Sequence, residues 1–318
     1  MITQSGDFYV LRSAILYIKE RIIMDTSIKM NRGDIIFNIF NYTFLSLLCL
    51  TILLPFIYLL AESFDRIGNI KATGIYLWPQ EFTIDNYLAI AQNTYIWKGY
   101  LNTVIRTVVG TILAVIVTAM GAYALAQKCF PHRTFWTLFV VFTMFFSGGI
   151  IPTYLWIDRL HLIDNRLVLI LPYLVNAYNL VLIRNFFQQI PAELQESARI
   201  DGASEYTILF KIILPVSKPI IATIALWLAV GHWNAWFDCL LYIKDTNKYV
   251  LQVILQRIIL QGTEQMMQSG GLIEGIYESR PEVIKAACIF FTMLPILCVY
   301  PFIQKYFVKG IFIGSIKG

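Results

Sequence analysis

Charged residues are scarce in this sequence. Asp, Glu, Lys and Arg make up 14% of the 318 residues, whereas hydrophobic residues make up 58% and the mean hydropathy is +0.64. Soluble domains carry about a quarter charged residues, so the composition excludes an ordinary soluble domain and predicts an integral membrane protein. The formal charge of +5 gives no nucleic-acid-binding footprint.

Cysteine and histidine are also few and scattered. The five cysteines form no Cys-x-x-Cys pair and lie mostly in apolar runs, which indicates packing residues rather than a disulfide framework or a metal site. They are Cys49, Cys129, Cys239, Cys288 and Cys298. The three histidines, His132, His161 and His232, are far apart in sequence. A membrane-embedded enzyme would need a catalytic constellation near one interface, and none is visible.

Long hydrophobic runs, in contrast, are abundant. Crossing a bilayer takes about 20 apolar residues, and six stretches reach that length. They are Ile35–Leu60, Gly99–Ala126, Phe135–Ile157, Leu167–Phe187, Pro219–Ile243 and Val283–Phe307. No soluble domain is left over. We therefore expect an all-α membrane protein with six transmembrane helices.

The distribution of positive charge predicts the orientation. With six spans, both termini share a side with the connection between the second and third runs and with the polar segment 190–218. That side holds 14 Lys and Arg against 8 Asp and Glu, and the other side holds 11 against 12. Because cytoplasmic loops carry excess positive charge, we expect both termini in the cytoplasm.

This orientation divides the chain into five parts. They are a cytoplasmic N-terminal segment (1–34), a first transmembrane helix (35–60), an extracytoplasmic segment (61–98), a core of five spans (99–307) and a cytoplasmic tail (308–318). In the extracytoplasmic segment, Phe82–Tyr87 marks a turn that leads into a short helix. The second long outer connection begins with Val250–Leu260, whose apolar residues follow helical spacing. This helix either lies along the membrane surface or packs onto neighbouring spans, and a flexible Gly262–Gly271 region follows it.

The polar segment Pro191–Pro215 contains the start and stop signals of two short helices. Pro191 suits a first helical turn, and Gly202 adopts the left-handed conformation that ends a helix. Ser204 can cap a second helix, which is expected to reach about Ile213 before Pro215 ends it.

The same segment resembles the EAA signature of ABC importer permeases. Its residues are Glu196-Ser197-Ala198, Gly202 after three further residues, and Ile212-x-Leu214-Pro215 after nine more. Ser197 replaces the usual Ala. Further strings look like the complex-oligosaccharide branch of the maltose-type carbohydrate-uptake permeases: Tyr100–Thr103, Phe146–Tyr154, Gly231–Trp236 and Tyr306–Gly310. The resemblance covers the chain from about Tyr100 to its end.

The resemblance implies a type I ABC importer permease fold, with a cytoplasmic coupling helix in the loop 190–218 between spans four and five. The implied ATPase-docking residues are Glu196, Ser197, Ala198, Arg199, Asp201, Gly202 and Ala203. Glu196 would pair with the ATPase, Ala198 and Ala203 would give close contact, and Arg199 and Asp201 would chiefly hold the loop's internal geometry.

The resemblance also implies partners. They are a second homologous permease, two ATP-binding subunits that bind ATP and Mg, and an extracytoplasmic sugar-binding protein on 62–98, 158–166 and 244–282. No cofactor is expected in this chain, and no Walker lysine motif follows Gly148-Gly149, so we expect a permease that is not itself an enzyme. The implied location is the bacterial cytoplasmic membrane, and the implied cargo is an oligosaccharide, including acidic, polysaccharide-derived ones.

Polar residues inside the apolar runs are candidates for the substrate pathway, because membrane-embedded polarity usually faces protein or a water-filled path. Amides and carboxylates suit sugar hydroxyls, and aromatic faces suit sugar C–H surfaces. The candidates are Asn176, Asn179, His232, Trp233, Asn234, Trp236 and Asp238. The alternative is interhelical hydrogen bonding with an interfacial aromatic belt. Arg106 is expected to snorkel or to pair with an acid such as Asp238.

An ion-coupled secondary transporter is the alternative within transport. Such proteins couple through buried acids near the midplane, often within an inverted repeat. The runs contain almost no acid apart from Asp238, and no internal repeat is visible.

Overall fold

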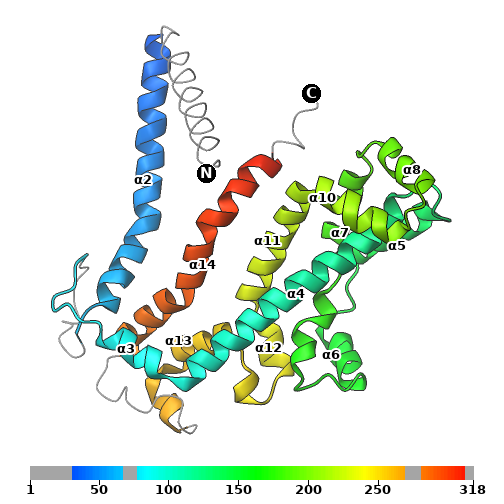
Figure 1. Ribbon diagram of the computed structural model, residues 1–318. Helices are drawn as coiled ribbons and strands as arrows, with labels where there is room; N and C mark the ends of the chain where they lie inside the picture. Colours follow the sequence, from blue (N-terminus) through cyan, green and yellow to red (C-terminus); the bar gives the residue numbers. More distant parts are fainter. Residues whose placement is uncertain (1–30, 67–76, 269–280, 312–318) are drawn as a thin grey trace, which may run out of the picture. The chain divides into compact units, whose positions relative to one another are not determined.

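The computed structural model describes residues 31–66, 77–268 and 281–311 (Figure 1). The chain divides into two units, Met1–Tyr58 and Leu59–Gly318. The predictions for most of the N-terminal segment, for part of the Gly262–Gly271 region and for most of the tail lie outside the described residues.

The described residues are mostly helical. The helices are α2 (Arg32–Ser63), α3 (Asp85–Gln92), α4 (Thr94–Ala126), α5 (Arg133–Phe145), α6 (Ile150–Arg159), η1 (Arg166–Leu169), η2 (Leu171–Tyr173), α7 (Ala177–Phe187), α8 (Ala192–Ile200), α9 (Glu205–Thr207), η3 (Ile208–Ile213), α10 (Leu214–Val216), α11 (Lys218–Asn234), α12 (Phe237–Tyr242), η4 (Thr246–Lys248), α13 (Leu251–Gln268) and α14 (Pro281–Ile311). The short helix predicted after Phe82 is α3.

Two helices, α2 and α4, are each long and apolar enough to cross a membrane without interruption. Three more candidates are bent pairs: α5 with α6 at 114°, η1–η2 with α7 at 46°, and α9–α10 with α11 at 87°. By length and composition the searched residues therefore contain up to five spans. The 31-residue helix α14 covers the sixth predicted run.

The third, fourth and fifth predicted runs are not continuous helices. The third breaks between Phe145 and Ile150, at the Gly148-Gly149 pair. The fourth contains Pro172, which has no N–H to donate, and a regular α-helix begins only at Ala177. The fifth stops at Asn234, because Ala235 is extended with ψ 129°, and it resumes as α12.

The second unit packs around α4, the long cyan-to-teal helix of Figure 1, which contributes to two hydrophobic clusters. Ile96, near the start of α4, packs with α3, α13 and the first turns of α14. Ala119 and Tyr123, near its end, pack with α7, α8 and η3. Leu251 and Ile254 of α13 are buried in the first cluster, which confirms the packing alternative for this segment.

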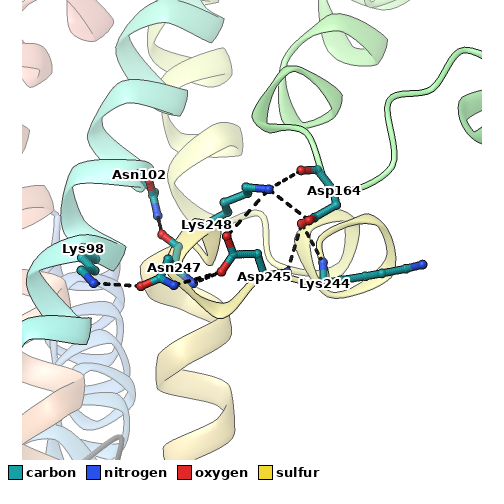
Figure 2. A network of polar contacts seen from close by, with 7 residues as sticks. All are labelled: Lys98, Asn102, Asp164, Lys244, Asp245, Asn247 and Lys248. Carbon is teal, nitrogen blue, oxygen red and sulfur yellow. Dashed lines mark hydrogen bonds and ion pairs between the residues drawn. The ribbon is translucent and has the colours of Figure 1, made fainter.

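A polar network lies at the N-terminal end of α4, near α3 (Figure 2). Asp164 Oδ1 accepts the backbone N–H groups of Lys244 and Asp245 at 3.1 and 3.0 Å, and its Oδ2 lies 3.0 Å from Lys248 Nζ. The Asn102 side chain of α4 donates to the carbonyls of Asn247 and Tyr249 at 2.9 and 3.0 Å. The network therefore ties the 244–249 segment both to α4 and to the connection after α6.

Candidate functional site

A cavity of about 540 Å³ lies between α4, the η2–α7 segment and the α11–α12 segment. Its size falls in the usual range of small-molecule sites. Its aromatic lining residues are Tyr173, Trp227, Trp236 and Phe237, and its amide residues are Asn176, Asn179 and Asn234. Arg106, His232 and Asp238 complete the polar lining. Aromatic faces beside hydrogen-bonding amides can bind a ring that is apolar on its faces and polar at its edge.

Six of the seven pathway residues expected from the sequence meet at this cavity: Asn176, Asn179, His232, Asn234, Trp236 and Asp238. Trp233 does not line it. Its side chain is buried in the neighbouring cluster, where its ring centroid is 6.4 Å from that of Tyr100. Trp233 is inside α11, and helical rotation places it on the face opposite residues 227, 231 and 234, so its predicted role in the pathway is not at this cavity.

Trp227, Tyr173 and Phe237 line the cavity but were not among the predicted residues. The sequence contains a signal for Trp227, since residues 227, 231 and 234 share one face of a helix at i, i+4 and i+7. It contains no comparable signal for Tyr173, which is in the irregular segment before α7. Asn176 is the N-cap of α7, and its side chain accepts the backbone N–H of Asn179 at 3.1 Å.

A buried ion pair holds the break in the fifth run. The two terminal nitrogens of Arg106 each donate to one carboxylate oxygen of Asp238, and Nη1 also donates to the Ala235 carbonyl at 3.1 Å. The side chains are only 3% and 6% exposed. The expected pairing of Arg106 with Asp238 is thus confirmed. Arg106 neutralises the carboxylate and binds a backbone oxygen that the broken helix leaves without a helical partner.

His232 is packed closely against α4. A Cβ atom added to Gly110 would lie 2.7 Å from His232 Nε2 and 2.9 Å from its Cε1. Only glycine leaves room for the ring at this point. The α4 backbone therefore fixes one wall of the cavity, with Gly110 one helical turn from Arg106.

The loop 190–218 has the predicted two-helix form. Gly202 has φ +79°, and its N–H donates to the Arg199 carbonyl at 3.0 Å, while Ala203 N–H donates to the Ala198 carbonyl at 2.9 Å. These two bonds form a Schellman motif that ends α8. Ser204 Oγ accepts the Thr207 N–H at 3.3 Å and caps the next helix, as predicted.

That second helix extends beyond its predicted end. It passes through a π-helical segment, η3, and ends at Val216 rather than before Pro215. Proline has no N–H to donate, and the wider π-helical spacing accommodates it, with Leu214 N–H bonded to the Leu209 carbonyl. The chain then turns by 87° into α11.

The predicted docking residues divide between two faces of α8. Glu196, Ser197, Arg199, Asp201 and Gly202 are exposed. Ala198 is buried in the chain's own core and Ala203 packs against the same cluster, so these two alanines pack the loop onto the rest of the chain.

Five large apolar side chains of this loop are exposed and were not predicted from the sequence: Leu194, Ile200, Tyr206, Phe210 and Val216. Leu194, Ile200 and Tyr206 are 44%, 87% and 68% exposed. Their residue types alone do not distinguish them from core residues. Together with Glu196 they give the loop a mixed apolar and acidic surface, of the kind that contacts other proteins.

Comparison with known proteins identifies the family. Residues 128–313 match the family described as "Binding-protein-dependent transport system inner membrane component". The chain belongs to this family. It is therefore a permease component of an ABC transporter in a cell membrane, and its relatives assign it to the sugar importers.

Two relatives of this permease come from Bacillus subtilis (strain 168). The polygalacturonan/rhamnogalacturonan transport system permease protein YtcP is 41% identical over 288 residues, which cover 89% of this chain and 99% of the relative. Protein LplC is 41% identical over 283 residues, covering 89% and 95%.

A solved structure has the same fold. It is a chain in the crystal structure of a bacterial ABC transporter involved in the import of the acidic polysaccharide alginate. It is 32% identical to this permease, with a TM-score of 0.81 and coverage of 87% of this chain and 99% of that chain. The helical importer-permease fold implied by the resemblance is thus confirmed.

Proposed function

We propose that this permease has six spans and forms half of a translocation pathway for oligosaccharides. Two ATPase subunits drive the transport, and the loop 190–218 is the docking site on this chain. The observation that carries the proposal is the exposed surface of α8, where Glu196 lies with Leu194 and Ile200 in a loop otherwise anchored by buried Ala198. Such a surface suits a protein partner.

The proposed topology has six spans with both termini in the cytoplasm. Five come from α2, α4 and the three bent pairs, and α14 supplies the sixth. The loop 190–218 then lies on the cytoplasmic side, where ATP and Mg would be bound by the partner subunits. A second, homologous permease completes the pathway, because the cavity of this chain is partly open rather than enclosed.

The proposed cargo is a polysaccharide-derived oligosaccharide. Tyr173, Trp227 and Trp236 supply aromatic faces in the cavity, and three asparagines supply hydrogen-bonding edges. The names of YtcP and of the alginate importer support acidic, uronate-rich fragments as the first candidates. An extracytoplasmic sugar-binding protein would deliver them at the outer connections, which include the polar network of Figure 2.

Ion coupling is less well supported as an alternative. A proton or sodium pathway needs an acid that can change its charge or its partner during transport. In the cavity that acid would be Asp238, whose two carboxylate oxygens are both engaged by Arg106. Releasing the acid would leave a buried arginine unpaired.

Copurification tests the proposed docking site. In the complete transporter, Glu196→Lys should weaken ATPase retention, since loss of an interfacial charge costs about 2–5 kcal/mol. The matched control is Glu81→Lys, a reversal of an exposed carboxylate in the outer segment. Among the residues that the structure describes it pairs with Arg66, at 3.7 Å on the surface. Normal ATPase retention by Glu196→Lys, or equal loss in both variants, would contradict the proposal.

Transport assays test the proposed cargo. Vesicles that contain the complete transporter and its binding protein should accumulate galacturonate or mannuronate oligosaccharides in the presence of ATP. Uptake that depends on an ion gradient and not on ATP would contradict the proposal.

A further inference from the structure

The loop 190–218 is bonded to the end of α4 by five side chains, which we call the tether: Tyr123, Gln127, Gln195, Arg199 and Glu205. Tyr123 donates its hydroxyl to Glu205 Oε2 at 2.5 Å. Arg199 Nε donates to Glu205 Oε1 at 2.8 Å. Gln127 accepts from Arg199 Nη2 at 3.2 Å and donates to Gln195 Oε1 at 2.9 Å.

The tether joins different elements at one carboxylate. Arg199 and Gln195 come from α8, Glu205 begins α9, and Tyr123 and Gln127 come from the last turn and the C-cap of α4. One oxygen of Glu205 accepts from Arg199 and the other from Tyr123 and Arg199. A displacement of α8 therefore reaches α4 directly, without first passing along the chain.

The alternative route, through the chain itself, is less stiff. After Glu205 the chain passes through a π-helical segment and then bends by 87° into α11. By contrast, α4 is one uninterrupted helix of 33 residues with no proline. Motion that enters α4 at Tyr123 is carried along one continuous helix, whereas motion that enters α11 must cross a bend.

The other part of α4 holds the cavity. Arg106, about 25 Å along the helix from Tyr123 at 1.5 Å per residue, binds Asp238 and the Ala235 carbonyl across the break in the fifth run. Gly110 contacts His232. One rigid element thus connects the loop surface to the residues that shape the cavity wall.

We propose that Tyr123 and Gln127, which lie outside the signature loop, transmit movement of α8 through α4 to the cavity. They are positioning residues and contact neither substrate nor ATP. The inference rests on the proposed function, since it requires that the ATPase moves α8. The proposal predicts that breaking the tether uncouples transport from hydrolysis. ATP is still hydrolysed, but less sugar is moved for each ATP.

The decisive variant is Tyr123→Phe in the complete transporter reconstituted in vesicles. It removes one hydroxyl and keeps the buried ring, while Glu205, 55% exposed, keeps Arg199 and gains water. ATPase retention should therefore be unchanged. The ratio of sugar moved to ATP hydrolysed should fall about fivefold or more, the lower range of measured couplings between sites.

Two controls separate transmission from general damage. Tyr95→Phe removes a hydroxyl at the opposite end of α4, where the ring still faces Lys98 Nζ at 5.5 Å, and it should leave the ratio unchanged. Gln127→Leu should lower the ratio, and Gln127→Glu, which keeps an acceptor for Arg199, should preserve most of it. Equal losses in the two Gln127 variants would contradict the role of that acceptor.

The outcomes distinguish the two proposals. A normal ratio in Tyr123→Phe overturns the tether while leaving the docking site intact. Full ATPase retention by Glu196→Lys overturns the docking site, and the tether with it. Loss of the ATPase from Tyr123→Phe also overturns the tether as stated, because it would make Tyr123 part of the docking surface.

Discussion

At the scale of single residues, the Arg106–Asp238 pair has the clearest energetic consequence. Both side chains are almost fully buried, and each is the other's charged partner. Removing one partner leaves a buried charge without compensation, which costs about 3–5 kcal/mol. Replacing both with apolar residues of similar volume removes that penalty. A buried pair of this kind therefore sets the geometry of the break more than it adds net stability.

We predict that Arg106→Ala lowers the unfolding free energy of the purified transporter by about 3–5 kcal/mol. The double variant Arg106→Met/Asp238→Leu should recover most of this loss. Denaturation by SDS titration in mixed micelles measures both. A single variant as stable as the unmodified protein, or a double variant no better than the single one, would show that the pair is not the main contact across the break.

At the scale of elements, the 244–249 segment depends on an acid whose charge can be tested. Hydrogen bonds from the Asp245 backbone and from Lys248 lower the pKa of Asp164 from its ordinary value of 3.8. A carboxylate with a lowered folded-state pKa stabilises the native arrangement above its ordinary pKa. That contribution is lost as the pH falls through the lower, folded-state value.

We therefore predict that the 244–249 segment loosens when the pH falls below about 3.8, the ordinary value from which the shift starts. Cleavage of this segment by pepsin, which is active in acid, should rise over that range. Asp164→Asn should show the increased cleavage at every pH tested, with little further change. A cleavage profile that is flat in the unmodified chain would contradict the role of the Asp164 carboxylate.

The elements that could be predicted from the sequence are those decided by local chemistry. Gly202 and Ser204 end and begin helices through bonds to residues at most five positions away, so their roles could be read directly. The break after Asn234 could not, because its partner is Arg106, more than a hundred residues earlier. Apolar runs also conceal such breaks, since composition does not change across them.

In the candidate site too, some features could be predicted from local sequence and others depend on contacts between distant residues. The residue types of the cavity were predictable, because polar groups in apolar runs are few. The break after Asn234 decides that Trp236 lines the cavity, whereas Trp233, inside α11, faces the neighbouring cluster by helical rotation alone. The exposed Leu194 and Ile200 could not be recognised, because a docking surface and a core use the same side chains.

At the scale of the whole molecule, orientation is the property on which the docking proposal depends. Fourteen cations against eight acids on one side predict that side to be cytoplasmic. Two exposed positions test this. Cys129 is in the α4–α5 connection beside α8, and Lys244 is in the 244–249 segment, with its side chain directed away from the network in Figure 2.

We predict that a membrane-impermeant maleimide labels Lys244→Cys in intact cells and does not label Cys129. Cys129 should react only after the membrane is opened and peripheral subunits are stripped with urea, since the ATPase would cover this end of α4. Cys49→Ala and Cys298→Ala remove the other exposed thiols, and the remaining two, Cys239 and Cys288, are buried. Labelling of Cys129 from outside would show that the topology is the reverse of the proposed one. It would place α8 where no ATP is available, so the docking site and the tether would both be wrong.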